Sequence, residues 1–135
     1  MMLVLDSEAV NALASRSTGM QRVKAALRAA VEAGADVVIP TVVLAELYRT
    51  SKHNAAINAM LSREGADLAL RDTDRTLASY VGGVLAAAEA GSEDIVDAHC
   101  VATVVERGRG IVLTGDETDL ARLSAPYPTV VVRTI

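Results

Sequence analysis

Short apolar runs alternate with longer amphipathic segments along the whole chain. The apolar runs have the length of strands and are rich in Val, Ile and Leu, which favour strand structure. They cover residues 3–5, 37–39, 68–70, 111–113 and 130–132. The pattern therefore predicts five strands separated by helices.

The segments between these runs have the periodicity of helices. Met20, Val23 and Leu27 recur at helical spacing, and Leu77, Val81 and others do the same later in the chain. Strands that are apolar on both faces are typical of parallel sheets, in which every return to the sheet needs a crossover helix. The fold class is therefore α/β, with a parallel sheet covered by helices on both faces.

Length and composition narrow the possible functions. The 135 residues are predicted to form one domain, residues 1–135, and only 2% of them are aromatic, which argues against a platform for stacking bases. A net charge of −4 argues against general coating of nucleic acid, so any contact with RNA must be local. The single cysteine, Cys100, and the lack of an apolar span of about 18 residues predict a cytoplasmic protein without a membrane segment.

Two acidic residues follow or neighbour predicted strand ends. Asp6 directly follows the first strand, and ligands of open α/β sheets bind at the carboxyl ends of strands. Asp6 is also a good helix N-cap, so it has two interpretations. Glu46 lies about one turn into an apolar helical segment that follows Pro40, which places it on the surface of that helix or at the edge of a pocket.

Further carboxylates lie in the second half of the chain. Asp97 belongs to an apolar helical segment, where an unpaired carboxylate needs a cation, a hydrogen-bond network or a proton. Asp94 is three residues earlier, on the same helix face, and is an alternative to Asp97. Asp116 follows the fourth strand after Thr114 and Gly115, and Asp119 is placed to cap the next short helix.

Carboxylates gathered at one sheet edge repel one another unless a cation neutralises them. Oxygen ligands without paired His or Cys suit Mg²⁺ or Mn²⁺ rather than zinc. His99 and Cys100 are adjacent in a helical segment, so their side chains diverge by about 100° and do not form a zinc pair. We expect Cys100 in the core and His99 on the helix surface or behind the site.

Together, Asp6, Glu46 in PTVVLAELYR, Asp97 in IVDAHCVATVVERG and Asp116 in IVLTGDETDL resemble the PIN-domain ribonucleases, and most closely the VapC toxins of bacterial toxin–antitoxin pairs. The resemblance spans almost the whole chain. It implies a three-layer α/β/α sandwich with a five-stranded parallel sheet. It also implies a homodimeric, Mg²⁺- or Mn²⁺-dependent endoribonuclease with a VapB-like antitoxin as partner.

The resemblance also implies roles for single residues. Asp6, Asp97 and Asp116 would hold the metal, and Glu46 would position or deprotonate the attacking water, leaving a 5′-phosphate and a 3′-hydroxyl. Thr114 and Asp119 are additional candidates, and Asp94 shares or replaces the role of Asp97. The number of metal ions stays open.

The sequence leaves open the role of three basic residues and an alternative function. Arg16, Arg49 and Lys52 are candidates for contact with RNA phosphates, or else they lie on solvated helix faces. The alternative function is a non-catalytic metal-binding regulatory module, PIN-like or receiver-like. The chain's only lysines, at 24 and 52, argue against the receiver, which needs a lysine near a late strand.

Overall fold

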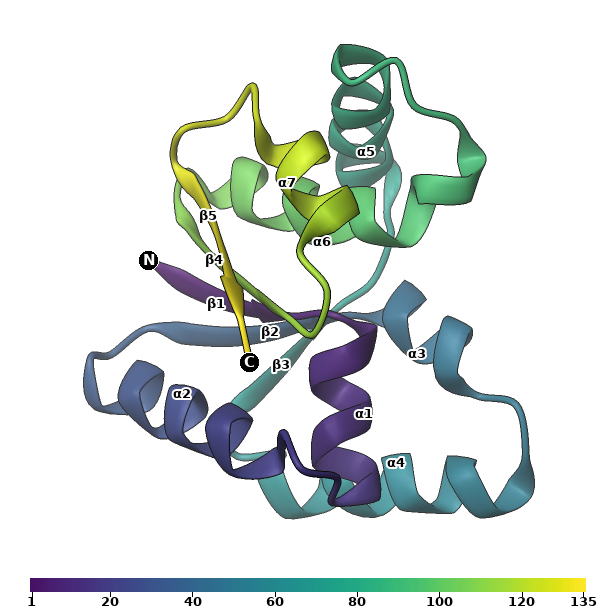
Figure 1. Ribbon diagram of the computed structural model, residues 1–135, viewed down its shortest axis with the longest axis vertical. Coiled ribbons are helices and arrows are strands. Elements are labelled where there is room, and N and C mark those ends of the chain that lie inside the picture. The colour runs from purple at the N-terminus through teal and green to yellow at the C-terminus, as the bar shows by residue number, and fades with distance from the viewer.

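The computed structural model describes residues 1–135 and has three layers (Figure 1). A five-stranded sheet crosses the middle of the molecule. Its strands are β1 Met2–Leu5, β2 Asp36–Pro40, β3 Leu68–Arg71, β4 Gly110–Thr114 and β5 Val130–Thr134. These strands contain all five apolar runs, so the predicted strands are confirmed, each with one or two additional residues at its ends.

Helices cover both faces of the sheet, as predicted. In Figure 1, α1, α2 and α4 lie below it and α5, α6 and α7 above it, while α3 packs against both α1 and α6. The helices are α1 Ser7–Ser15, α2 Met20–Glu32, α3 Thr41–Leu47, α4 Ser51–Glu64, α5 Arg75–Ala87, α6 Ile95–Arg107 and α7 Thr118–Ser124, with the short 3₁₀ helix η1 Ser92–Asp94 before α6. No helix is long and apolar enough to cross a membrane.

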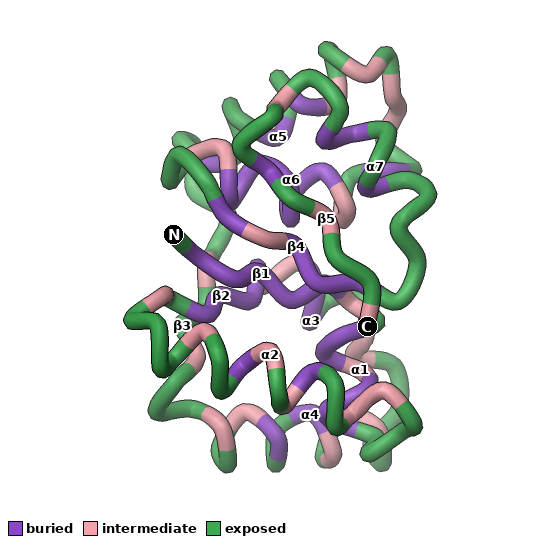
Figure 2. Tube along the Cα trace, turned by 60° about the vertical axis from the view of Figure 1, so that its left-hand side comes forward, coloured by how far each residue is buried: buried purple, intermediate pink, exposed green.

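The core lies between the sheet and the two helical layers (Figure 2). All four residues of β1 are buried, as expected for the central strand of a sheet that is covered on both sides. Burying a Leu or Val side chain of this kind contributes about 1.5–3 kcal/mol to folding. The core therefore holds β1 firmly, and with it the residue that follows the strand.

The strand order creates a specific edge for a site. All neighbouring strands are parallel, and their order is β3-β2-β1-β4-β5. From β1 the chain first moves outward through β2 to β3, then returns to the other side of β1 with β4. Ligands of open α/β sheets bind where the order reverses in this way, outside the carboxyl ends of the two strands. Here that place lies after Leu5 and Thr114.

The same strand order excludes the receiver-like alternative. Receiver domains have the order 2-1-3-4-5, whereas this chain places β2 between β3 and β1. The receiver interpretation is therefore wrong.

Candidate functional site

Asp6 has both of the roles considered for it. Its Oδ1 accepts a hydrogen bond from the Ala9 amide at 2.9 Å, so it caps α1. It also lies at the switch between β1 and β4, with only 4% of its surface exposed. Burial raises the pKa of Asp6 and the charge of Glu46 adds to the rise, while the hydrogen bond from the Ala9 amide opposes it. The buried carboxylate therefore has one amide donor and no cation beside it.

Asp97, in the first turn of α6, carries the strongest signal of a site. Its side chain is half-buried, and its pKa is raised to about 6, first by burial and then by surrounding negative charges. Those charges are Asp6, Asp119, Glu46 and Asp94. The structure therefore brings together the ends of β1, α3, η1, α6 and α7. We call Asp6, Glu46, Asp94, Asp97 and Asp119 the acidic cluster.

Glu46 reaches this cluster from α3. The helix is short, and the Arg49 guanidinium closes its end by donating to the carbonyl oxygens of Ala45 and Tyr48, each at 2.7 Å. The Glu46 side chain is exposed and has no ion pair, and its charge acts on both Asp6 and Asp97. Of the two interpretations of Glu46, the structure therefore supports the pocket edge.

Asp94 and Asp97 differ in their neighbours. Asp94 Oδ2 lies 2.8 Å from Arg122 Nη2, and the same guanidinium nitrogen lies 3.7 Å from Asp119 Oδ1. These carboxylates raise the pKa of Arg122, the hydrogen-bonded Asp94 most strongly. One arginine therefore pairs with Asp94 and lies near Asp119, which offsets part of their negative charge, while Asp97 has no cationic partner.

Asp116 lies at the expected strand end, but its carboxylate bonds to the start of α7. Its Oδ1 accepts from the Thr118 amide at 3.0 Å, and the hydrogen bonds from Thr118 lower its pKa. The Thr114 hydroxyl also accepts from the Asp116 amide at 3.0 Å, which fixes the turn. Asp116 rather than Asp119 thus bonds an amide at the start of α7. Its charge is not among those that raise the pKa of Asp97.

The sequence interpretation missed Glu8, which connects Asp116 with the rest of the site. Burial raises the pKa of Glu8, and the charges of Asp6 and Asp116 raise it further. Two residues after Asp6, Glu8 is an ordinary acid for the first turn of a helix, so its position alone gave no signal. Gly115 is the residue that points to Glu8. Gly115 has no positive φ angle, so its backbone does not require glycine. A Cβ at this position would overlap the Glu8 carboxylate.

We predict that Gly115→Ala displaces the Glu8 side chain and leaves the fold intact. The overlap involves a flexible carboxylate, so we expect the melting temperature to change by no more than about 3 °C. Nuclear magnetic resonance should show the largest shifts at Glu8, Asp6 and Asp116. Gly82→Ala, in open space on α5, is the matched control. Unchanged Glu8 resonances in Gly115→Ala would contradict the contact.

His99 and Cys100 take no part in the cluster. His99 is buried, not on the helix surface, and its ring nitrogens lie 2.7 Å from the Ile95 carbonyl oxygen and 2.9 Å from the Thr73 hydroxyl. The surface interpretation of His99 is therefore wrong. Cys100 is in the core as expected, and burial raises the pKa of its thiol.

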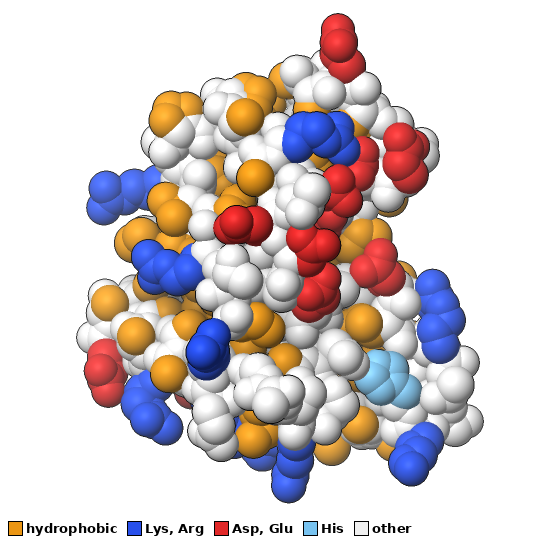
Figure 3. Space-filling model, in the orientation of Figure 1, with side chains coloured by type: hydrophobic (Ala, Val, Ile, Leu, Met, Phe, Trp, Pro, Cys, Tyr) orange, Lys and Arg blue, Asp and Glu red, His pale blue; other side chains and the backbone are white.

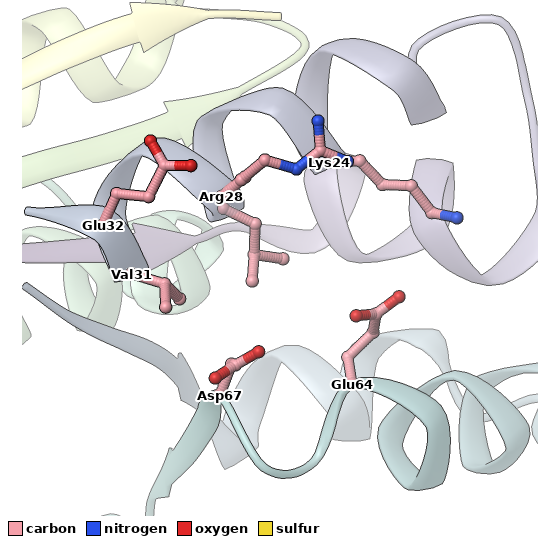
Figure 4. Close-up of a pocket in the computed structure, with 7 residues that line it drawn as sticks. Lys24, Arg28, Val31, Glu32, Glu64 and Asp67 are labelled. Atoms are coloured by element: carbon pink, nitrogen blue, oxygen red, sulfur yellow. The ribbon is translucent and has the colours of Figure 1, made fainter.

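A groove of about 430 Å³ runs beside the acidic cluster along α1; among its lining residues are Ser7, Glu8, Asn11 and Glu46. The Ser7 hydroxyl is the only buried side-chain polar atom without a hydrogen-bond partner. In Figure 3, acidic side chains gather where α1, α3, α6 and α7 meet, while Lys and Arg side chains lie mostly over the lower layer. The largest hollow, about 440 Å³, is remote from these acids, between α2 and the end of α4 (Figure 4).

A family model matches most of the chain. The model of the PIN domain matches residues 3–125. The chain belongs to the PIN-domain family. The predicted family and the predicted α/β fold are thus confirmed.

Among solved structures, this PIN domain is similar to VapBC2 from Rickettsia felis, which was crystallised bound to a DNA fragment from its promoter. The TM-score is 0.70 at 16% identity, and the match covers 99% of this chain and 98% of the other. At that identity, the likeness concerns the fold. Comparison with curated protein sequences finds no match.

Proposed function

We propose that this PIN domain is a Mg²⁺- or Mn²⁺-dependent endoribonuclease and the toxin of a type II toxin–antitoxin system. The observation that carries the proposal is Asp97, whose pKa is raised to about 6 among like charges. Retaining a half-buried carboxylate among other carboxylates costs stability, and that cost is offset when a divalent cation binds. The family and the switch-point position support the same activity.

The residues fit such a cation by their chemistry. Asp6, Asp97 and Glu46 offer only oxygen ligands and form no ion pair, and the unpartnered Ser7 hydroxyl lies beside Asp6. No three acidic, His or Cys side chains are already arranged around one metal position, so the carboxylates must turn to bind. Asp6 and Asp97 would hold the ion, and Asp116 would join after releasing Thr118. When bound, such an ion polarises a phosphate oxygen and lowers the pKa of a bound water molecule.

The remaining residues would act on the proton and on the surrounding charge. Glu46 is exposed at the groove and acts on Asp6 and Asp97 from α3, so it would orient the attacking water and accept its proton. Arg122 offsets part of the negative charge of Asp94 and Asp119, which reduces the repulsion that an RNA phosphate would meet at this edge. Asp97 rather than Asp94 is our choice as the metal ligand because Asp94 already has an arginine partner.

The test is cleavage of a mixed pool of tRNA, rRNA and mRNA by the purified protein with Mg²⁺, Mn²⁺ or EDTA. We expect discrete products that need the metal. Glu46→Gln should retain metal binding and lower turnover by about a hundredfold, as is usual when a general base is lost. Glu64→Gln, on the remote end of α4, is the matched control. Metal binding by folded wild-type protein without cleavage of any RNA would favour the alternative, a non-catalytic PIN-like regulatory module.

The proposal includes two partners that the resemblance implies: a VapB-like antitoxin and a second copy of the chain. The likeness in fold to VapBC2 of Rickettsia felis supports the antitoxin. An antitoxin that inserts a basic side chain among the unpaired carboxylates would block the site.

A further inference from the structure

A second hollow, of about 400 Å³, lies at the opposite end of α1 from Asp6. The residues that line it include Arg16, Lys52 and His53, together with Ser15 and Thr50. Arg16 ends α1, whereas Lys52 and His53 belong to the first turn of α4. Three side chains that are basic or can become so therefore meet at one place in a protein whose net charge is −4.

The two cations of this hollow are free to bind an anion. Every ion pair in the chain lies elsewhere, and neither Arg16 nor Lys52 makes a side-chain hydrogen bond. Arg49 differs, because its Nη1 donates to two carbonyl oxygens at the end of α3. The hollow also includes the start of a 14-residue helix, whose dipole favours negative charge. Arg16 and Lys52 are therefore the candidate phosphate contacts in this hollow, and Arg49, which does not line it, keeps only part of its guanidinium free.

The hollow and the acidic cluster lie along the same face of α1. Ser7 and Asn11 line the groove beside the cluster, and Ser15 lines the basic hollow. These residues are spaced by four and so share one helix face. On the other side, the chain leads from Glu46 in the groove to Thr50 in the hollow. The two sites thus lie at the ends of one path, with α1 on one side and the α3–α4 connection on the other, and apolar Ala12 and Leu47 line it beside the polar residues.

We propose that the Arg16–Lys52–His53 hollow binds the phosphate backbone of a single RNA strand whose scissile bond lies at the acidic cluster. This inference rests on the proposed function. The nine residues of α1 span about 14 Å, which corresponds to about four stacked nucleotides, or fewer in an extended strand. The hollow would determine on which side of the scissile bond the enzyme binds the RNA and how long the RNA must be.

The size of the path favours a single strand over a duplex. A hollow of about 400 Å³ is small for a duplex, whose two strands would both have to approach it. Single-stranded loops are also the RNA regions in which proteins most often read sequence. An acidic segment of a protein partner is the competing occupant, and the experiment separates it from RNA.

The experiment measures binding of a fluorescent twelve-nucleotide single-stranded RNA of mixed sequence in EDTA, where no cleavage occurs. The test variant is Arg16→Gln/Lys52→Gln. Its matched control is Lys24→Gln/Arg28→Gln, which removes the same charge from the hollow in Figure 4. We expect the test variant to bind about tenfold more weakly. Its plot of log Kd against log salt should be shallower by about 1.4, which is about 0.7 for each lost contact with a single strand. The control should bind like the wild type.

Substrate length gives a second readout. Once a cut site is known, wild type should cleave oligonucleotides that extend at least four nucleotides from it toward the hollow with a lower KM than shorter ones. The test variant should treat both lengths alike with unchanged kcat. Equal losses in the test variant and the control, or none in either, would overturn the inference. So would a test variant that binds RNA normally but loses an acidic protein partner.

The two proposals can fail separately. If wild type cuts no RNA while binding depends on Arg16 and Lys52, the nuclease proposal fails and the RNA path stands. If wild type cuts RNA and neither variant changes binding or the length preference, the nuclease stands and the path fails.

Discussion

Asp97→Asn should abolish metal-dependent RNA cleavage, with a loss of at least about a hundredfold, and leave the fold intact. The substitution keeps the shape of the side chain and removes the charge that a divalent cation would need. The rate is measured with the RNA that wild type cuts best. Asp94→Asn is the matched control: it should cost less, because Asp94 already pairs with Arg122 at 2.8 Å. Full activity in Asp97→Asn together with loss in Asp94→Asn would move the metal ligand to Asp94.

Asp97→Asn should be more stable than wild type in EDTA at neutral pH. Because the folded protein raises the pKa of Asp97 to about 6, the native state binds more protons than the unfolded chain between about pH 4 and 6. Stability of wild type should therefore fall as the pH rises through this window. Asp97→Asn should flatten the fall and gain on the order of 1 kcal/mol above pH 6, allowing for solvent screening of the half-buried group. Urea unfolding at several pH values measures the free energy of unfolding of both proteins. An Asp97→Asn variant whose stability depends on pH as strongly as that of wild type would contradict the raised pKa of Asp97.

Replacing Asp6 by Ala should remove both the helix cap and the site charge, whereas replacing it by Asn should remove only the charge. Asn caps helices as well as Asp does, so Asp6→Asn should keep the bond to the Ala9 amide, now seen at 2.9 Å, and lose the site charge. Asp6→Ala should lose both. We expect both variants to lose cleavage by at least about a hundredfold, and Asp6→Ala to be about 1 kcal/mol less stable than Asp6→Asn.

The thermal melt separates the two functions. A difference of about 1 kcal/mol corresponds to about 3–5 °C in a domain of this size. Equal melting temperatures for Asp6→Ala and Asp6→Asn would show that the cap contributes nothing. Cleavage by Asp6→Asn at the wild-type rate would exclude Asp6 from the chemistry, whatever the cap contributes.

The fold could be predicted closely because it depends on local patterns. The runs of Val, Ile and Leu bury both of their faces, and that property alone distinguishes strands of a covered parallel sheet from the intervening amphipathic helices. The acids at strand ends followed from the same argument: the carboxyl ends of parallel strands share one edge, so Asp6 and Asp116 had to lie near each other. The family model matching residues 3–125 agrees with this pattern.

The environment of each acid could not be predicted, because it depends on residues that are distant in sequence. Asp94 and Arg122 are 28 positions apart, and only the packing of α6 against α7 brings them together. Glu8 became a site candidate only when Gly115, more than a hundred residues later, left room for its carboxylate. The two alternatives for His99, the helix surface or a place behind the site, stayed open for the same reason, since Thr73 comes from another segment and bonds the ring within the interior.

The sequence by itself determined the succession of strands and helices along the chain, the parallel sheet and the position of Asp6 and Asp116 after two of its strands, because hydrophobic periodicity and strand direction are local properties. Only the tertiary structure decided which carboxylates face one another, which are neutralised and which rotate away: Asp97 is unpaired, Asp94 is paired and Asp116 is turned to Thr118. Charge and hydrogen-bonding environments arise from contacts between distant segments. A residue's position in the chain therefore fixes its place on the edge and not the partner it meets there.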